Sequence, residues 1–152
     1  MHLSAAGLRL MKNAEGFRDR TYIDVAGIAT IGFGHRLLPG ESFPRGIDET
    51  QGEAILLSDV RSAEQAIEHL VRVPLTQGQF DALVDFAFNL GAGRLAASTF
   101  LRDLNAGKFD AAAAELVRWD HAGAQELAGL KARREAELQL WNGGDSAQGA
   151  VA

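Results

Sequence analysis

The chain contains no cysteine among its 152 residues. This absence excludes a disulfide framework, a cysteine-ligated zinc site and a thiol nucleophile. A basic surplus is also missing, because 15 Lys and Arg stand against 20 Asp and Glu and give a net charge of −5. Proteins that bind nucleic acid or an anionic membrane surface gain affinity from excess basic side chains, so we expect neither partner here.

Long apolar runs are absent as well. No stretch approaches the ~18 apolar residues needed to span a bilayer. Arg9 and Lys12 interrupt the segment in which a signal peptide would need its apolar core, so we expect a protein that accumulates in the cytoplasm without stable membrane association. The four histidines are scattered, and no HExxH, GxSxG or phosphate-loop pattern occurs. We therefore expect no metal and no cofactor.

The composition, with 47% hydrophobic and 23% charged residues, is that of an ordinary globular protein. Ser4 as an N-cap and Gly16 as a terminating residue predict a first helix that ends near Glu15. Glycines, prolines and β-forming side chains dominate residues 17–47. This segment predicts a small antiparallel sheet with a turn near Val25–Gly27.

The remainder of the chain shows helical periodicity. A capping-box pattern at Thr50 and Glu53 predicts a helix that runs to about Arg72 and spans roughly 30 Å, long enough to connect two lobes. Thr76 and Gln79 form a second capping box. Further helices are predicted over residues 76–91, 98–105, 110–119 and 126–141.

Together these elements predict a mainly helical α+β fold in a single domain, residues 1–152. Its expected parts are an N-terminal lobe with a β-hairpin (about 12–50), a connecting helix (about 50–72), a helical C-terminal lobe (about 74–142) and a flexible tail (143–152). The tail carries no core-forming residues. We expect a monomer.

Carboxylates are the remaining candidates for catalysis. Glu15 ends the first helix, Asp24 lies at the hairpin turn, and Thr30 follows on the next strand. Cleaving a glycosidic bond requires an acid that protonates the leaving oxygen and a second carboxylate that activates water or stabilises positive charge. A carboxyl group at a partly apolar junction is favoured in its protonated form, whereas one at an exposed turn stays ionised. By itself, however, a Glu–Asp pair at this spacing is more often a pair of surface charges.

The stretch EGFRDRTYIDVAGIATIGFGH (15–35) resembles the active-site hairpin of the phage lysozyme family, glycoside hydrolase family 24. The family pattern is Glu-Gly, a Tyr, an Asp nine residues after the Glu, a Gly, and Thr-Ile-Gly-x-Gly-His. Every position of this pattern is matched. More weakly, FAFNLG (86–91) resembles the family's helix at the substrate cleft, and GLKARREAELQLW (129–141) resembles the C-terminal segment of related endolysins.

This resemblance implies that Glu15 donates a proton to the glycosidic oxygen and that Thr30 holds the hydrolytic water. Asp24 would position or activate that water, or stabilise positive charge at C1, in an inverting reaction. His35 resembles a family histidine that pairs with an aspartate, matched here by Asp59, and we interpret this as a structural ion pair. The implied substrate contacts are Tyr22, Arg36, Phe88, Asn89 and Phe100.

The function implied is that of an endolysin. It would hydrolyse the β-1,4 bond between N-acetylmuramic acid and N-acetylglucosamine in peptidoglycan. Made in the host bacterial cytoplasm, it would reach the periplasmic wall after a holin-type partner opens the membrane. The alternative is a muramidase-like domain that binds or scaffolds peptidoglycan with little turnover, and the acidic net charge leaves it open. An unrelated helical protein would require the hairpin match to be accidental.

Overall fold

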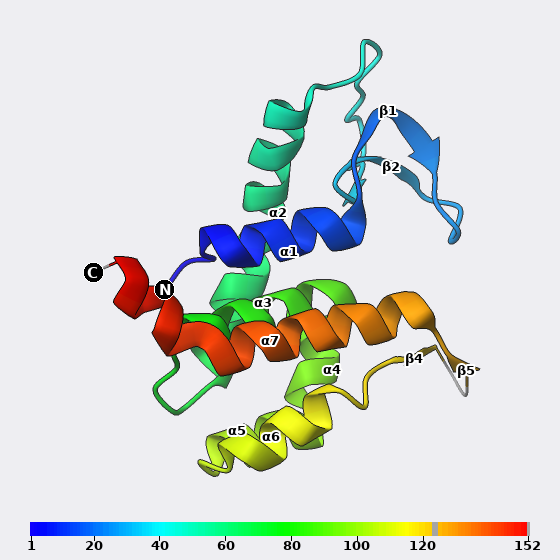
Figure 1. Cartoon of the computed structure of the whole chain (residues 1–152). Coiled ribbons are helices and arrows are strands. Elements are labelled where there is room, and N and C mark those ends of the chain that lie inside the picture. The colour runs from blue at the N-terminus through cyan, green and yellow to red at the C-terminus, as the bar shows by residue number, and fades with distance from the viewer. Residues whose placement is uncertain (123–124, 152) are drawn as a thin grey trace. The chain divides into compact units, whose positions relative to one another are not determined.

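The computed structural model describes residues 1–122 and 125–151, and Figure 1 shows the course of the chain. The helices are α1 (Ala5–Glu15), α2 (Glu49–Leu70), α3 (Gln77–Leu90), α4 (Ala92–Ala96), α5 (Thr99–Asn105), α6 (Phe109–Leu116) and α7 (Ala128–Val151). The strands are β1 (Arg18–Ile23), β2 (Ala29–Gly32), β3 (His35–Arg36), β4 (His121–Ala122) and β5 (Gln125–Glu126). The predicted α+β class, mainly helical with a small antiparallel sheet, is confirmed. Within the described ranges, no helix is both long and apolar enough to cross a membrane.

The chain forms two compact units, and α1 and α2 each contribute residues to both. One unit comprises Met11–Arg61 and contains the three-stranded sheet. The other comprises Met1–Leu10 together with Ser62–Ala152 and is mostly helical.

In the first of these units, the strands are ordered β1-β2-β3 and both pairings are antiparallel. The turn between β1 and β2 is the predicted one, with Gly27 at φ +80°. The helix α1 ends as expected at Gly16, which has φ +70° and donates its N–H to Lys12 O at 3.0 Å. Behind the sheet, the rings of Phe17 and Phe33 lie 5.1 Å apart, and the buried apolar side chains are Met11, Ile31, Phe33, Ile47, Leu56 and Val60.

The start of α2 corrects one prediction. Asp48 Oδ1 accepts the Gln51 N–H at 2.7 Å, and Gln51 Oε1 accepts the Asp48 N–H at 2.8 Å. This reciprocal pair is a capping box two residues earlier than the one predicted at Thr50 and Glu53. Glu53 instead forms an ion pair with Lys12 at 2.9 Å, because it lies inside the helix, where its carboxylate cannot reach the free N–H groups at the helix start.

The other end of α2 also differs slightly from the sequence prediction. The helix ends at Leu70 rather than near Arg72. Asn105 provides the reason, since its side-chain amide donates to Leu70 O at 3.0 Å and its side-chain oxygen accepts the Arg72 N–H at 2.8 Å. A side chain from α5 thus satisfies backbone groups that another helical turn would otherwise pair.

The helix α3 is the buried centre of the mostly helical unit and packs along α7 (Figure 1). Its start is the predicted capping box of Thr76 and Gln79, and Gly91 ends it with φ +98°. An aromatic cluster surrounds Phe86, whose ring centroid lies 5.3 Å from that of Phe100 and 5.5 Å from that of Trp119. α3 is therefore buried along most of its length and contributes Phe86 to the aromatic core.

Several short or shifted elements were not anticipated. α4 has five residues, too few for helical periodicity to reveal, although Leu95 within it is fully buried. The β4–β5 pair occupies the region where a helix was predicted from Glu126, so α7 starts at Ala128, and α6 ends at Leu116. α7 continues as helical backbone to Val151, through most of the predicted tail.

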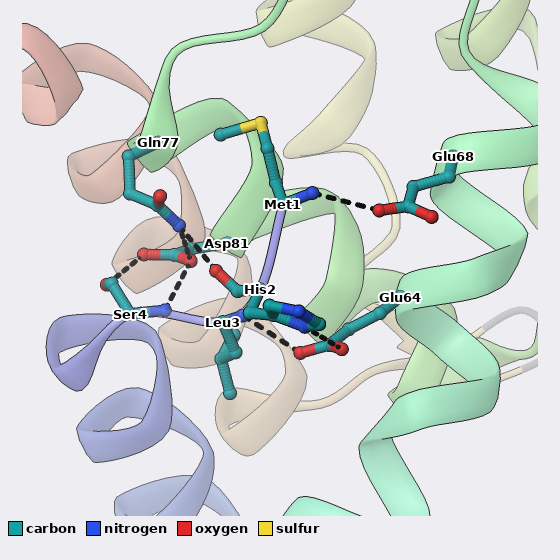
Figure 2. Close-up of polar contacts among 8 residues, drawn as sticks. All are labelled: Met1, His2, Leu3, Ser4, Glu64, Glu68, Gln77 and Asp81. Atoms are coloured by element: carbon teal, nitrogen blue, oxygen red, sulfur yellow. Dashed lines mark hydrogen bonds and ion pairs between the residues drawn. The ribbon is translucent and has the colours of Figure 1, made fainter.

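The N-terminal segment is bound to α2 and α3 by carboxylates (Figure 2). Ser4 caps α1 by accepting the Gly7 N–H at 3.2 Å. Asp81 accepts the Ser4 N–H at 3.0 Å and also the Ser4 hydroxyl. Glu64 accepts the Leu3 N–H at 2.9 Å. The predicted N-cap is therefore present and is itself held by a buried carboxylate from another helix.

Candidate active site

Asp24 forms the turn between β1 and β2. Its Oδ1 accepts the N–H groups of Ala26 at 2.8 Å and Ile28 at 2.9 Å. Its backbone N–H donates to Ile28 O at 2.9 Å. A side chain that accepts hydrogen bonds from the backbone within its own turn is the reason why Asp favours such positions. The carboxylate is thus fixed in place by local backbone geometry.

The same contacts keep Asp24 ionised. The hydrogen bond from Ile28 N–H is the largest effect on its pKa, and together with those from Ala26 N–H and the nearby Arg36 charge it outweighs desolvation and lowers the pKa. The Thr30 hydroxyl also lies close to the Asp24 carboxylate. Arg36 Nε lies 3.7 Å from Asp24 Oδ2. A carboxylate with a lowered pKa stays ionised more readily and has the chemistry to accept a proton or stabilise positive charge.

Three predicted site residues form a row across the sheet. Tyr22 pairs with Thr30, and Thr30 pairs with Arg36, so their side chains share one face. Thr30 is 2% exposed and its hydroxyl donates to Ile28 O at 2.9 Å. The Arg18 guanidinium stacks over the Tyr22 ring, 4.6 Å from its centroid. The register of the strands thus brings these residues together beside Asp24.

Glu15 is the last residue of α1 and is half-buried. Its carboxylate lies against the turn between β2 and β3, because a Cβ placed on Gly34 would be only 2.6 Å from Glu15 Oε2. Gly34 also has φ +75°. Both observations require glycine at this position. The second glycine of the Gly-x-Gly-His motif therefore leaves room for the Glu15 carboxylate.

His35 follows this glycine and lies between two carboxylates. Its Nδ1 is 2.7 Å from Asp59 Oδ2, so the predicted pairing is present, and its Nε2 is 2.7 Å from Glu41 Oε1. Burial lowers the pKa of His35, but the hydrogen bonds and charges of Glu41 and Asp59 outweigh this effect and raise it. Sequence reasoning missed Glu41, since it lies in the 37–47 loop, where no motif marked it.

The remaining predicted contacts belong to the mostly helical unit. Phe88 and Asn89 are partly exposed near the end of α3, and Asn89 Oδ1 accepts a hydrogen bond from Arg134 at 2.8 Å. Phe100 was predicted to contact substrate, and this is wrong. It is fully buried, with its ring 5.3 Å from that of Phe86 and 5.6 Å from that of Trp141. Its side chain is core, where no sugar can touch it.

A buried charge cluster joins α3 and α7. Arg133 binds both carboxylate oxygens of Asp85, at 2.8 and 2.9 Å, and Arg134 binds Glu137 at 2.7 Å. Burial, followed by hydrogen bonding to Asp85, raises the pKa of Glu137. Burial also opposes ionisation of Asp85, but its hydrogen bonds, first of all with Arg133, lower its pKa. The sequence showed these arginines only as a short basic cluster.

The described parts of the chain hold no group of three or more His, Asp or Glu side chains placed to bind a metal ion. The residues that the sequence singled out lie together in the unit Met11–Arg61, apart from the three on α3 and α5. The members of this group are Glu15, Tyr22, Asp24, Thr30, His35, Arg36 and Asp59.

Comparison with known proteins identifies the family of the chain. The family model for phage lysozyme matches residues 12–137. The chain is 40% identical over 149 residues to an endolysin of Bacillus phage B103, covering 96% of this chain and 56% of that protein. It thus spans little more than half the length of that relative. It is also 40% identical over 144 residues to an endolysin of Salmonella phage P22, covering 92% of this chain and 99% of that protein.

The fold gives the same result. The crystal structure of a P22 lysozyme variant superposes with a TM-score of 0.84 at 37% identity, covering 93% of this chain and 99% of that one. The matched family model includes the whole hairpin on which Asp24, Thr30 and the Glu15 carboxylate are arranged. The chain belongs to the phage lysozyme family.

Proposed function

We propose that the chain is a muramidase that hydrolyses the β-1,4 bond between N-acetylmuramic acid and N-acetylglucosamine in bacterial peptidoglycan. One observation carries the proposal: two carboxyl groups are anchored at opposite ends of β2. Asp24 is bound by backbone N–H groups at the start of the strand, and Glu15 packs on Gly34 just beyond its end. Membership of the phage lysozyme family and the endolysin relatives support it.

In the proposed reaction, Glu15 donates its proton to the glycosidic oxygen as the bond from that oxygen to C1 breaks. A water molecule attacks C1, and its proton passes to Asp24, whose lowered pKa keeps it ionised for this purpose. Thr30 is the proposed holder of the water, since its hydroxyl lies beside Asp24. Its proton already goes to Ile28 O at 2.9 Å, so the hydroxyl oxygen remains an acceptor for the water.

We infer an inverting outcome from the resemblance of the hairpin to that of the phage lysozyme family, and the separation of the two carboxyl groups is its check. The four residues of β2 span about 13 Å at ~3.3 Å per residue, and the two carboxyl groups start from its opposite ends. Inverting enzymes separate their carboxyl groups by roughly 6.5–9.5 Å to admit a water, whereas retaining enzymes need about 5–5.5 Å. The proposed inversion requires the larger of these two separations between the Glu15 and Asp24 carboxyl groups.

The proposed substrate contacts are those left on accessible surface. Tyr22 and Arg36 flank Thr30 on the sheet, and Arg36 also helps hold the charge of Asp24. Phe88 and Asn89 are partly exposed in the other unit. Arg134 accounts for the orientation of Asn89, because its hydrogen bond occupies the amide oxygen. A sugar hydroxyl or acetamide oxygen would therefore meet the amide nitrogen.

The proposed biological setting is host cell lysis by a phage. The chain would act as a monomer on the periplasmic wall after a holin-type partner releases it from the cytoplasm. Relatives that carry the name endolysin support this setting. The alternative, a domain that binds the wall with little turnover, is not favoured, because the residues proposed as acid, base and water holder, Glu15, Asp24 and Thr30, are all present.

The test is clearing of purified cell walls by the parent chain, Glu15→Gln and a control, Glu115→Gln. The control makes the same charge change at a partly exposed glutamate that forms an ion pair with Arg118 in the helical unit. We expect the parent and the control to clear walls and release reducing sugar ends, and Glu15→Gln to do neither while folding normally. A parent that binds walls without clearing them would overturn the proposal in favour of the binding alternative. NMR of the first-formed product anomer tests inversion.

A further inference from the structure

His35 is held between two carboxylates at equal distance. Both its ring nitrogens lie 2.7 Å from a carboxylate oxygen, Nδ1 from Asp59 and Nε2 from Glu41. A neutral imidazole has one N–H and can donate to only one of them, whereas an imidazolium donates to both. The geometry therefore fits the cationic form of the ring.

Glu41 connects the 37–47 loop to this cation. Its Oε1 accepts from His35 and also from the Leu38 N–H, at 3.0 Å. The side chains of His35 and Glu41 are 9% and 30% exposed, so the pair is largely shielded from solvent. One carboxylate oxygen thus closes the start of the loop back onto β3. On the opposite side of the His35 ring, the hydrogen bond with Asp59 connects the ring to α2.

The residues on either side of His35 touch the two proposed catalytic carboxyl groups. Gly34 forms the surface against which Glu15 packs, and Arg36 lies 3.7 Å from Asp24. Because side chains alternate along a strand, His35 points away from Arg36, toward Glu41 and α2. A displacement of His35 would therefore move both of its neighbours, Gly34 against which Glu15 packs and Arg36 beside Asp24.

We propose that Glu41 is a positioning residue for the reaction, holding His35 as a cation and thereby fixing the β2–β3 segment that supports Glu15 and Asp24. This inference rests on the proposed function. Among the described residues, the charged groups that act on His35 are Glu41 from the loop and Asp59 from α2. When His35 loses its proton, one of the two carboxylates loses its hydrogen bond from the ring, and the ring holds the segment from one side only.

The raised pKa of His35 gives the sign of the effect. The hydrogen bonds from the His35 ring to both Asp59 and Glu41 are present while His35 is protonated, and one of them is lost as pH rises through the pKa of His35 in the folded state. Replacing Glu41 by its amide removes the charge but keeps an oxygen that can accept from both His35 and Leu38. The Glu41→Gln variant should keep the geometry of the β2–β3 segment at low pH. As pH rises, it should lose that geometry at a lower pH than the parent does.

The first experiment measures the pH dependence of wall hydrolysis for the parent, Glu41→Gln and the control Glu49→Gln. Glu49 is exposed in the same unit, in the first turn of α2. We expect rates at about pH 5.5 to agree within about twofold, and the Glu41→Gln rate at about pH 8 to be several-fold lower, because its alkaline limb moves to lower pH. An unmoved alkaline limb, or the same movement in Glu49→Gln, would overturn the inference.

The second experiment needs no activity. NMR titration of the His35 ring in the parent and in Glu41→Gln measures the protonation directly, and hydrogen exchange of the Leu38 amide reports the loop contact. We expect the ring to titrate at lower pH in the variant. An unchanged titration overturns the role of Glu41. If the parent clears no wall while the titration does shift, the failure lies in the proposed function and not in the contact between Glu41 and His35.

Discussion

Substituting Gly34 by alanine should displace the Glu15 carboxylate and reduce activity strongly, while it lowers the stability of the fold only modestly. Gly34 has φ +75°, and the new Cβ would lie 2.6 Å from Glu15 Oε2. The carboxylate oxygen must retreat to at least 3.4 Å, the start of ordinary contact, a movement of about 0.8 Å. Because this oxygen is at the far end of a flexible side chain, the movement itself costs the fold little.

The two consequences have different magnitudes. A non-glycine residue in the left-handed region costs about 1–2 kcal/mol, which for a chain of this length lowers the Tm by about 2–4 °C per kcal/mol. A misplacement of about 1 Å in a catalytic group can cost about a hundredfold in rate. We therefore expect modest destabilisation together with a fall of up to about a hundredfold in wall hydrolysis.

Gly107→Ala is the matched control. Gly107 has φ +76°, but a Cβ there would meet nothing within 4 Å, and it lies between α5 and α6 in the helical unit. Calorimetry should show a similar loss of Tm in both variants, and the wall-clearing assay should show a large loss in Gly34→Ala alone. Equal activity in the two variants would refute the proposal that packing against Gly34 positions the Glu15 carboxylate for catalysis.

Three further predictions concern stability. Asp85→Asn should lower the free energy of unfolding by about 3–5 kcal/mol in urea titrations, because it leaves the guanidinium of Arg133 buried without its charge partner; a loss below about 1 kcal/mol would contradict this. Gly7→Ala should cost about 1–3 kcal/mol, since the new Cβ would lie 2.8 Å from Cγ of the buried Asp81 as well as 2.6 Å from Leu3 Cδ1; an unchanged Tm would show that both side chains move aside freely. The stability contributed by His35 should be complete below pH 6.5, its ordinary pKa, and decline as pH rises through the raised folded-state pKa; Asp59→Asn should flatten that decline, and an unaltered slope would speak against the pairing.

Local chemistry explains why much of the fold could be predicted from the sequence. The capping box of Thr76 and Gln79, the reversal at Gly16 and the turn that starts at Asp24 each depend on residues a few positions apart. The resemblance of residues 15–35 to the phage lysozyme motif singled out Glu15 and Asp24 as catalytic candidates. The early start of α2 at Asp48 was missed because two overlapping capping patterns compete, and only one can match the direction of the incoming chain.

Contacts between distant segments could not be predicted in this way. Burial of Phe100 in the aromatic core depends on which face of α5 meets α3 and α7, and periodicity does not reveal that choice. The same holds for Arg133 and Arg134, which look like a solvated basic cluster in the sequence and are buried once α7 packs on α3.

The sequence by itself determined the class of fold, the hairpin and the candidate carboxylates of Glu15 and Asp24, because each depends on the spacing of residues that lie close together in the chain. Tertiary structure alone decided that Glu41 faces His35, that Gly34 is the surface beneath Glu15, and that the arginines of α7 are paired inside. Those arrangements join segments that are separated in the chain, and their energies depend on distances, burial and charge that exist only after the segments have packed.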